Sequence, residues 1–162
     1  MSNPTELDGS EDILSKEAVV AADLDAVWRA WTTEDGLRFV SGRSKVELEP
    51  GGAYEWFLDL EPDERGRRGG QGSHFLAILP KDMIVFAWTF PPTIPALRNR
   101  DAMTQVVVRF SALADAQTRV RMDVGGWQEG DDWQRGREYF DQAWDLVLSR
   151  LAESFQGDAP AI

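Results

Sequence analysis

The chain has 162 residues, of which 43% are hydrophobic and 28% charged, and these proportions are typical of one soluble globular domain. Its formal net charge of −11 argues against general binding to nucleic acid or to anionic membranes, because such a field repels phosphate groups. The absence of cysteine excludes a disulfide framework and thiolate metal ligands. No apolar run reaches the roughly 18 residues of a membrane span.

The polar, acidic start MSNPTELDGSED resembles neither a signal peptide nor a transit peptide, so we expect a cytoplasmic protein. Residues 1–11 have no periodicity and are expected to form a disordered tail. A strand is predicted over Ile13–Ala21. Asp23 then suits an N-cap for a short helix over Leu24–Trp31, and the stretch 34–40 adds a further helical turn.

From Arg43 to Gly126 the hydrophobic period changes to two, which is typical of strands. The intervening turns are rich in glycine, proline and aspartate, and the short connections favour an antiparallel meander with one apolar, aromatic face. The predicted strands are Lys45–Leu48, Ala53–Leu60, Gln71–Leu79, Ile84–Phe90, Thr104–Ala112 and Thr118–Val124.

The last predicted element is a long helix over Trp133–Phe155, whose apolar residues recur at steps of three, four and seven. Gly157 and Pro160 provide a stop signal. Only this helix is long enough to cover the apolar face of the sheet. We therefore predict an α+β fold, in which a curved antiparallel sheet of about six to seven strands wraps around the C-terminal helix. Residues 12–157 form the single domain, and 158–162 form a short tail.

In this order and spacing, several motifs resemble those of the START-like helix-grip (SRPBCC) superfamily. Within it they are most similar to the group named after the C-terminal domain of the activator of heat shock protein 90 ATPase. The resemblance spans roughly residues 13–156 and rests on Ala22–Thr32 (ADLDAVWRAWT), Pro50–Tyr54 (PGGAY), Ile78–Trp88 (ILPKDMIVFAW), Thr118–Met122 (TRVRM) and Gly125–Trp127 (GGW).

The resemblance implies a helix-grip fold but no single activity, because the superfamily includes lipid and hormone carriers, polyketide cyclases and co-chaperone domains. Seven tryptophans, eight phenylalanines and two tyrosines can either fill the core or line a cavity between sheet and helix. The predicted lining residues are Trp56, Leu58, Phe75, Phe86, Trp88, Val108, Met122, Phe140, Trp144 and Leu148. Phe75 depends on the register of its strand, since Phe75 and Ala77 compete with Leu76 and Ile78 for the inner face.

The loop 91–103 is long enough to act as a lid, and we place Arg98 and Arg100 at the cavity entrance, where they can meet the polar end of a ligand. The alternative is that this loop and the RGRRGG segment at 65–70 are simply solvated. His74 is the only histidine and is expected to be a surface or structural residue rather than a general base. No cofactor fingerprint and no metal-ligand spacing is present, so we expect neither group.

Three functions follow from these patterns. The first is non-enzymatic binding of a small hydrophobic or amphipathic molecule, aromatic or lipid-like, in the interior. The second is a protein-interaction module that contacts a chaperone, as the resemblance implies. The third is an enzyme of the cyclase or hydrolase kind acting in the same cavity. The sequence is compatible with a monomer or a homodimer.

Overall fold

The computed structural model describes residues 12–58 and 60–156. The predicted tails at 1–11 and 158–162 lie outside these residues. In chain order the elements are β1 (Leu14–Val20), α1 (Leu24–Thr32), η3 (Gly36–Phe39), β2 (Arg43–Val46), β3 (Tyr54–Phe57), β4 (His74–Leu79), β5 (Met83–Thr89), α2 (Pro95–Arg98), β6 (Met103–Leu113), β7 (Gln117–Gly125) and α3 (Asp131–Gln156).

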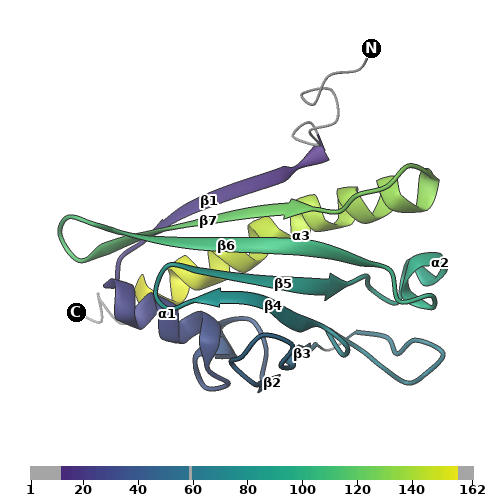
Figure 1. The fold of residues 1–162 in the computed structure, drawn as a ribbon, viewed down its shortest axis with the longest axis horizontal. Coiled ribbons are helices and arrows are strands. Elements are labelled where there is room, and N and C mark those ends of the chain that lie inside the picture. Colours follow the sequence, from purple (N-terminus) through teal and green to yellow (C-terminus); the bar gives the residue numbers. More distant parts are fainter. Residues whose placement is uncertain (1–11, 59, 157–162) are drawn as a thin grey trace, which may run out of the picture.

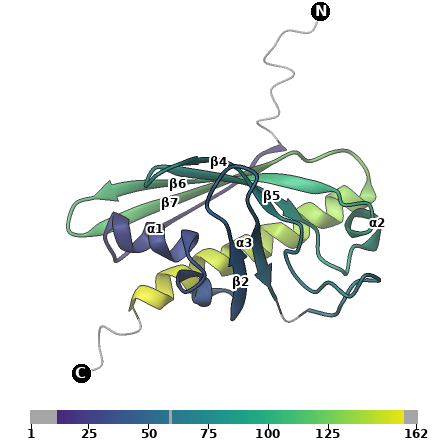
Figure 2. The ribbon, with the colours of Figure 1, turned by 60° about the horizontal axis from the view of Figure 1, so that its bottom comes forward.

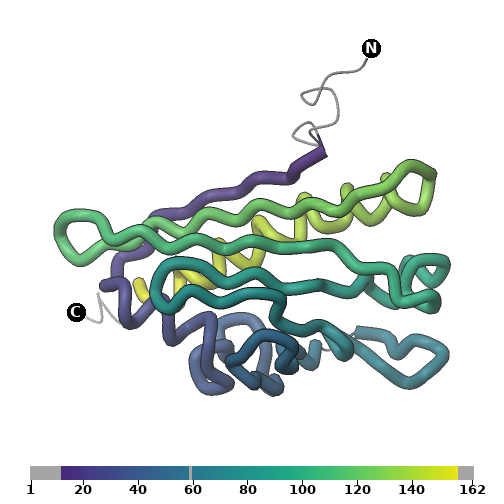
Figure 3. Tube along the Cα trace, viewed as in Figure 1, coloured from purple at the N-terminus to yellow at the C-terminus, as the bar shows by residue number. Residues whose placement is uncertain are grey.

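The main sheet has five antiparallel strands in the order β1-β7-β6-β5-β4, and strands β4 to β7 follow one another as a meander (Figure 3). The first strand of the chain, β1, pairs with the last strand, β7. The pair β2-β3 forms a separate small sheet, joined to β4 by a bridge between Ala53 and His74. The predicted α+β helix-grip architecture is confirmed.

The helix α3 runs along one face of the main sheet, and α1 packs beside it under the same face (Figures 1 and 2). Asp131 and Asp132 lie in the first turn of α3, where negative charge interacts favourably with the helix dipole. Its buried stripe is Trp133, Gly136, Phe140, Trp144, Val147, Leu148 and Leu151. None of the helices in the described part of the chain combines the length and the apolar character needed to cross a bilayer.

Two predicted strands are shorter than expected. The stretch 53–60 forms a strand only over Tyr54–Phe57, and 71–79 only from His74 onward. In both cases the missing residues lie in or next to the loop 61–73. There Gly69 approaches the backbone of Trp56 and Leu58, and Gly70 the Trp88 ring, too closely for a Cβ atom. The sheet pairing is lost where this loop folds back on β3.

A β-bulge in β4 settles the register that the sequence leaves open. The pairing of β4 with β5 shifts between Phe75 and Ala77, so that Phe75 pairs with Phe86 and Ile78 pairs with Ile84. Phe75 is fully buried and Ile78 packs against the core, whereas Leu76 is 41% exposed. The bulge therefore turns Phe75 and Ile78 inward together, a combination that strict alternation forbids.

Candidate functional site

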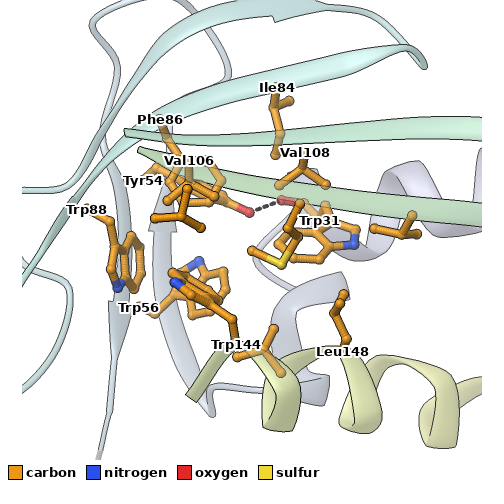
Figure 4. Packing of buried hydrophobic residues seen from close by; sticks show 14 of the residues in the cluster. Trp31, Tyr54, Trp56, Ile84, Phe86, Trp88, Val106, Val108, Trp144 and Leu148 are labelled. Carbon is orange, nitrogen blue, oxygen red and sulfur yellow. Dashed lines mark hydrogen bonds between the residues drawn. The ribbon is translucent and has the colours of Figure 1, made fainter. Parts of the chain in front are cut away.

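Three tryptophans from three different elements meet between the sheet and α3. Trp144 points from α3 toward Trp56 of β3, and Trp88 of β5 lies beside them (Figure 4). The ring centroids lie 4.7 Å apart for Trp56 and Trp88, 5.9 Å for Trp56 and Trp144, and 5.6 Å for Trp88 and Trp144. The edge-to-face and tilted orientations are those that aromatic pairs favour.

A cavity of about 60 Å³ lies against this cluster. Five of the predicted lining residues border it, namely Trp56, Leu58, Trp88, Phe140 and Trp144. A ligand pocket for a drug-sized molecule typically measures about 300–1,000 Å³. In this conformation the rings therefore fill most of the space between helix and sheet, and a larger ligand requires side chains to move.

The other five predicted residues, Phe75, Phe86, Val108, Met122 and Leu148, are buried in the same core but do not border the cavity. Phe75 packs against Tyr54 at 4.4 Å between ring centroids. Tyr54 itself donates a 2.5 Å hydrogen bond to the carbonyl of Trp31 (Figure 4), and burial raises the pKa of its phenol. These buried residues belong to the core around the cavity but do not line it.

Sequence reasoning missed four lining residues: Val40, Tyr139, Ala143 and Val147. Tyr139, Ala143 and Val147 are spaced by four on α3, one position beside the stripe of Phe140 and Trp144. That spacing is visible in the sequence, but which edge of the helix stripe faces a cavity depends on how the helix is rotated against the sheet.

The indole Nε1 of Trp144 is buried without a hydrogen-bond partner among the described residues. That of Trp56 has the Tyr54 hydroxyl nearby, but not in regular hydrogen-bond geometry. A buried donor left unpaired costs about 1–3 kcal/mol, and most buried donors in native proteins are paired. Both rings border the cavity. The site therefore combines apolar walls with donors that an acceptor atom of a ligand can satisfy.

A second, smaller cavity of about 20 Å³ lies at the Arg98 side of the first. Leu58, Trp88, Tyr139 and Phe140 border both cavities, so the two spaces are separated by side chains. The remaining lining of the smaller cavity comes from the loop before β4, from the end of β5 and from α2, as Leu60, Gly69, Gly70, Thr89, Phe90, Pro91 and Arg98.

Arg98 lies at the inner side of this region rather than at an open entrance. Its side chain is 2% exposed, and its Nε donates to Asp63 Oδ2 at 2.8 Å. Its Nη1 donates to the carbonyls of Gly69 and Phe90, each at 2.7 Å. Arg100, in contrast, is exposed. The helix α2, which the sequence does not predict, accounts for this difference because it carries Arg98 inward with Leu97.

The arginines of the 65–70 segment are not simply solvated. Arg65 donates to Asp101 at 2.9 Å and to the carbonyl of Arg98 at 3.0 Å, and Arg67 pairs with Asp63 at 3.1 Å. Burial alone would raise the pKa of Asp63, but the bonds from Arg98 and from the Arg65 amide, with the arginine charges, bring it below its usual value. The network fastens the loop 61–70 to α2.

Tyr139 is a residue that three neighbouring hollows share. It borders an open groove of about 460 Å³, together with Leu60, Glu61, Arg68 and three residues of the 91–93 turn, and it also borders the two inner cavities. Burial raises the pKa of its phenol, and the charge of Arg98 partly offsets this rise. The position of this side chain therefore affects all three spaces.

His74 lies away from these cavities. It is half-buried on β4, and its Nδ1 lies 3.0 Å from the carbonyl of Gly72. The residues described by the structure contain no cluster of three or more histidine or carboxylate side chains arranged for a metal ion.

The sequence comparison identifies the family. Residues 21–156 match the family described as "Activator of Hsp90 ATPase homolog 1-like protein". The chain belongs to this family. No curated protein matched the sequence significantly.

Solved structures of low sequence identity share the fold. Protein MLL2253 from Mesorhizobium loti superposes with a TM-score of 0.70 at 16% identity, over 90% of this chain and 98% of that one. The Aha1 dimer from Colwellia psychrerythraea gives 0.68 at 14% identity, with 88% and 95% covered. PFC0360w, an HSP90 activator from Plasmodium falciparum, gives 0.66 at 18% identity, with 90% and 96% covered. At these identities the likeness concerns the fold alone.

Proposed function

We propose that this domain binds a small hydrophobic or amphipathic molecule between the sheet and α3, without catalysing a reaction. The observation that carries the proposal is the 60 Å³ cavity bordered by Trp56 and Trp144, whose buried indole donors make no regular hydrogen bond among the described residues. Apolar walls with a few unpaired polar atoms are the usual composition of a ligand site. Binding a molecule with an acceptor atom relieves the cost of those unpaired donors.

The side chains around the cavities favour binding over catalysis. A cyclase or hydrolase of this fold needs a general acid or base that reaches the substrate. Of the described residues that line the two cavities, Tyr139 and Arg98 carry ionisable groups. Burial raises the pKa of the Tyr139 phenol, which makes it a poorer base at neutral pH. These two groups suit recognition of a ligand better than proton transfer.

Ethylbenzene is a suitable first probe because it is apolar and close in size to one aromatic side chain. At about ten times its dissociation constant, bound probe should raise the thermal midpoint by about 4 °C for a chain of this length. Chemical-shift changes in two-dimensional NMR spectra should cluster on α3, β3 and β5.

Ala143→Leu provides the decisive variant because Ala143 borders the cavity, so that a leucine fills it. We expect this variant to lose the thermal shift. Gln142→Leu adds the same side chain at an exposed position one residue earlier on α3 and should keep it. An absent shift in the unmodified protein, or an equal shift in Ala143→Leu, would show that the interior does not bind the probe.

A second candidate function is contact with an Hsp90-type chaperone, which the family description and the Plasmodium falciparum activator favour. Its structural support is an apolar area on the outer face of the sheet. Leu76 and Leu79 of β4 are 41% and 50% exposed, and Met83, Val85 and Val107 are half-exposed beside them. Contiguous exposed apolar surface often marks an interaction site.

The assay is the ATPase rate of the Hsp90-type chaperone from the same organism, measured with and without this domain. Stimulation that disappears in Leu76→Ser/Leu79→Ser, but persists in Ala143→Leu, would assign the chaperone contact to the outer sheet face. An unchanged rate at saturating domain concentration argues against the chaperone function and leaves interior binding untouched.

A further inference from the structure

Arg98 has one guanidinium nitrogen left for a ligand. Its Nε and Nη1 are engaged by Asp63, Gly69 and Phe90, whereas its Nη2 is buried without a hydrogen-bond partner among the described residues. The whole side chain is 2% exposed. An unpaired charged donor in such a place is costly, and a guanidinium nitrogen carries two protons that can each be donated.

The unpaired nitrogen belongs to a residue that lines the smaller cavity. That cavity of about 20 Å³ has room for about one water-sized atom. Tyr139 and Phe140 border it together with the larger, tryptophan-lined cavity. A ligand that occupies the larger cavity and displaces these rings therefore meets Arg98 at one end and the indoles of Trp56 and Trp144 at the other.

The local charge favours an anion at the Arg98 end. Among the described residues, ion pairs join Arg65, Arg67 and Arg98 to Asp63 and Asp101, so within this network three positive groups face two negative ones. This excess stands out in a chain whose formal net charge is −11. A single anionic group would neutralise it and accept the hydrogen bonds of Nη2.

We propose that the interior site takes a small carboxylic acid with an aromatic or branched apolar body. The carboxylate accepts hydrogen bonds from Arg98 Nη2, and the apolar body lies among Trp56, Trp88 and Trp144. A carboxylate fits better than a phosphate, because it is the smaller group for the narrow space beside Arg98 and its single negative charge matches the one-charge excess of this ion-pair network. This inference rests on the proposed interior binding.

The test compares 4-ethylbenzoate with its neutral analogue 4-ethylbenzamide by isothermal titration calorimetry on the unmodified protein. A hydrogen bond to a charged group in a buried site should make the acid bind about tenfold tighter or more. The comparison requires no variant, so it stands even where substitutions at Arg98 unfold the protein. Equal affinity of the two probes overturns the inference but keeps interior binding, whereas binding of neither probe overturns both.

Variants then assign the preference to Arg98. Asp63→Asn/Arg98→Met removes both partners of the ion pair, so it leaves no buried charge unpaired. We expect it to bind acid and amide equally, and near-ultraviolet circular dichroism checks that the tryptophan cluster is intact. Arg100→Met removes an exposed arginine two residues away and should keep the preference. If the folded double variant still binds the acid tenfold more tightly than the amide, the carboxylate contacts another group and the role proposed for Arg98 is wrong.

Discussion

Replacing Arg98 by methionine tests how far the buried ion pair holds the two loops together. The substitution keeps an unbranched side chain but removes the 2.8 Å bond to Asp63 and the two 2.7 Å bonds to the carbonyls of Gly69 and Phe90. Breaking a buried pair by removing one partner typically costs about 3–5 kcal/mol. Asp63 keeps bonds from Arg67 Nε and from the amides of Arg65 and Arg67, so we expect the lower end, about 3 kcal/mol.

A double-mutant cycle separates the pair from the remaining contacts of Arg98. Asp63→Asn/Arg98→Met should be more stable than Arg98→Met, because it removes a buried carboxylate that has lost its nearest charged partner, and we expect a coupling energy of about 1–2 kcal/mol. Urea unfolding followed by tryptophan fluorescence gives the four free energies of unfolding. The reasoning fails where Arg98→Met lies within about 1 kcal/mol of the unmodified protein, or where the second substitution recovers no stability.

Three further substitutions test other features of the structure. The pKa of Asp63 is lower in the folded protein than its ordinary value of 3.8, so its contribution to stability is present above that pH and lost as the pH falls through the folded pKa. Urea midpoints of Asp63→Asn should therefore decline less steeply in acid than those of the unmodified protein, and parallel profiles would contradict this. Gly136→Ala gains helix propensity, yet its Cβ would lie 2.4 Å from Phe90 Cε1, so overpacking of about 1–3 kcal/mol should make it less stable by thermal unfolding. Tyr54→Phe loses the bond to the Trp31 carbonyl and should cost about 1 kcal/mol in urea unfolding; an unchanged midpoint would argue against that bond.

The sequence was sufficient for the fold because the relevant signals are local. A period of two over 43–126 and the stripe of α3 predict the sheet and its covering helix, and both were confirmed. The register of β4 was beyond this reasoning. A bulge at Leu76 lets Phe75 and Ile78 both face inward, and a bulge is a local break of the alternation from which register is predicted.

The candidate site could be predicted only in part. Trp56, Trp88 and Trp144 were found because large rings on inward-facing positions must meet under the helix. The small residue Ala143, which leaves the space, gave no signal of its own. The location of Arg98 depends on contacts far apart in sequence, since its partners Asp63 and Gly69 lie 35 and 29 residues away. From the sequence alone, arginines in such loops are expected to be solvated. Only the tertiary structure shows that Arg98 is buried whereas Arg100 is exposed.

The unpaired donors need a physical explanation, because a protein core usually either provides hydrogen-bond partners for its buried polar groups or contains no such groups. Phenylalanine at positions 56 and 144 would keep ring packing and remove the unpaired indole groups, which is the less costly way to fill an interior. The chain instead places two tryptophans and a buried arginine around two neighbouring spaces. Unpaired buried donors lower the free energy of unfolding of the protein without ligand, and a ligand that accepts their hydrogen bonds offsets this cost. Ligand binding would therefore explain both the stability cost and the proposed acid site. Trp144→Phe should accordingly raise the free energy of unfolding of the free protein. In calorimetry it should also weaken the binding of 4-acetylbenzoate, whose ketone oxygen can accept a hydrogen bond from the indole, more than that of 4-ethylbenzoate, which has no acceptor at that end. A variant that loses stability and keeps full affinity would remove this link.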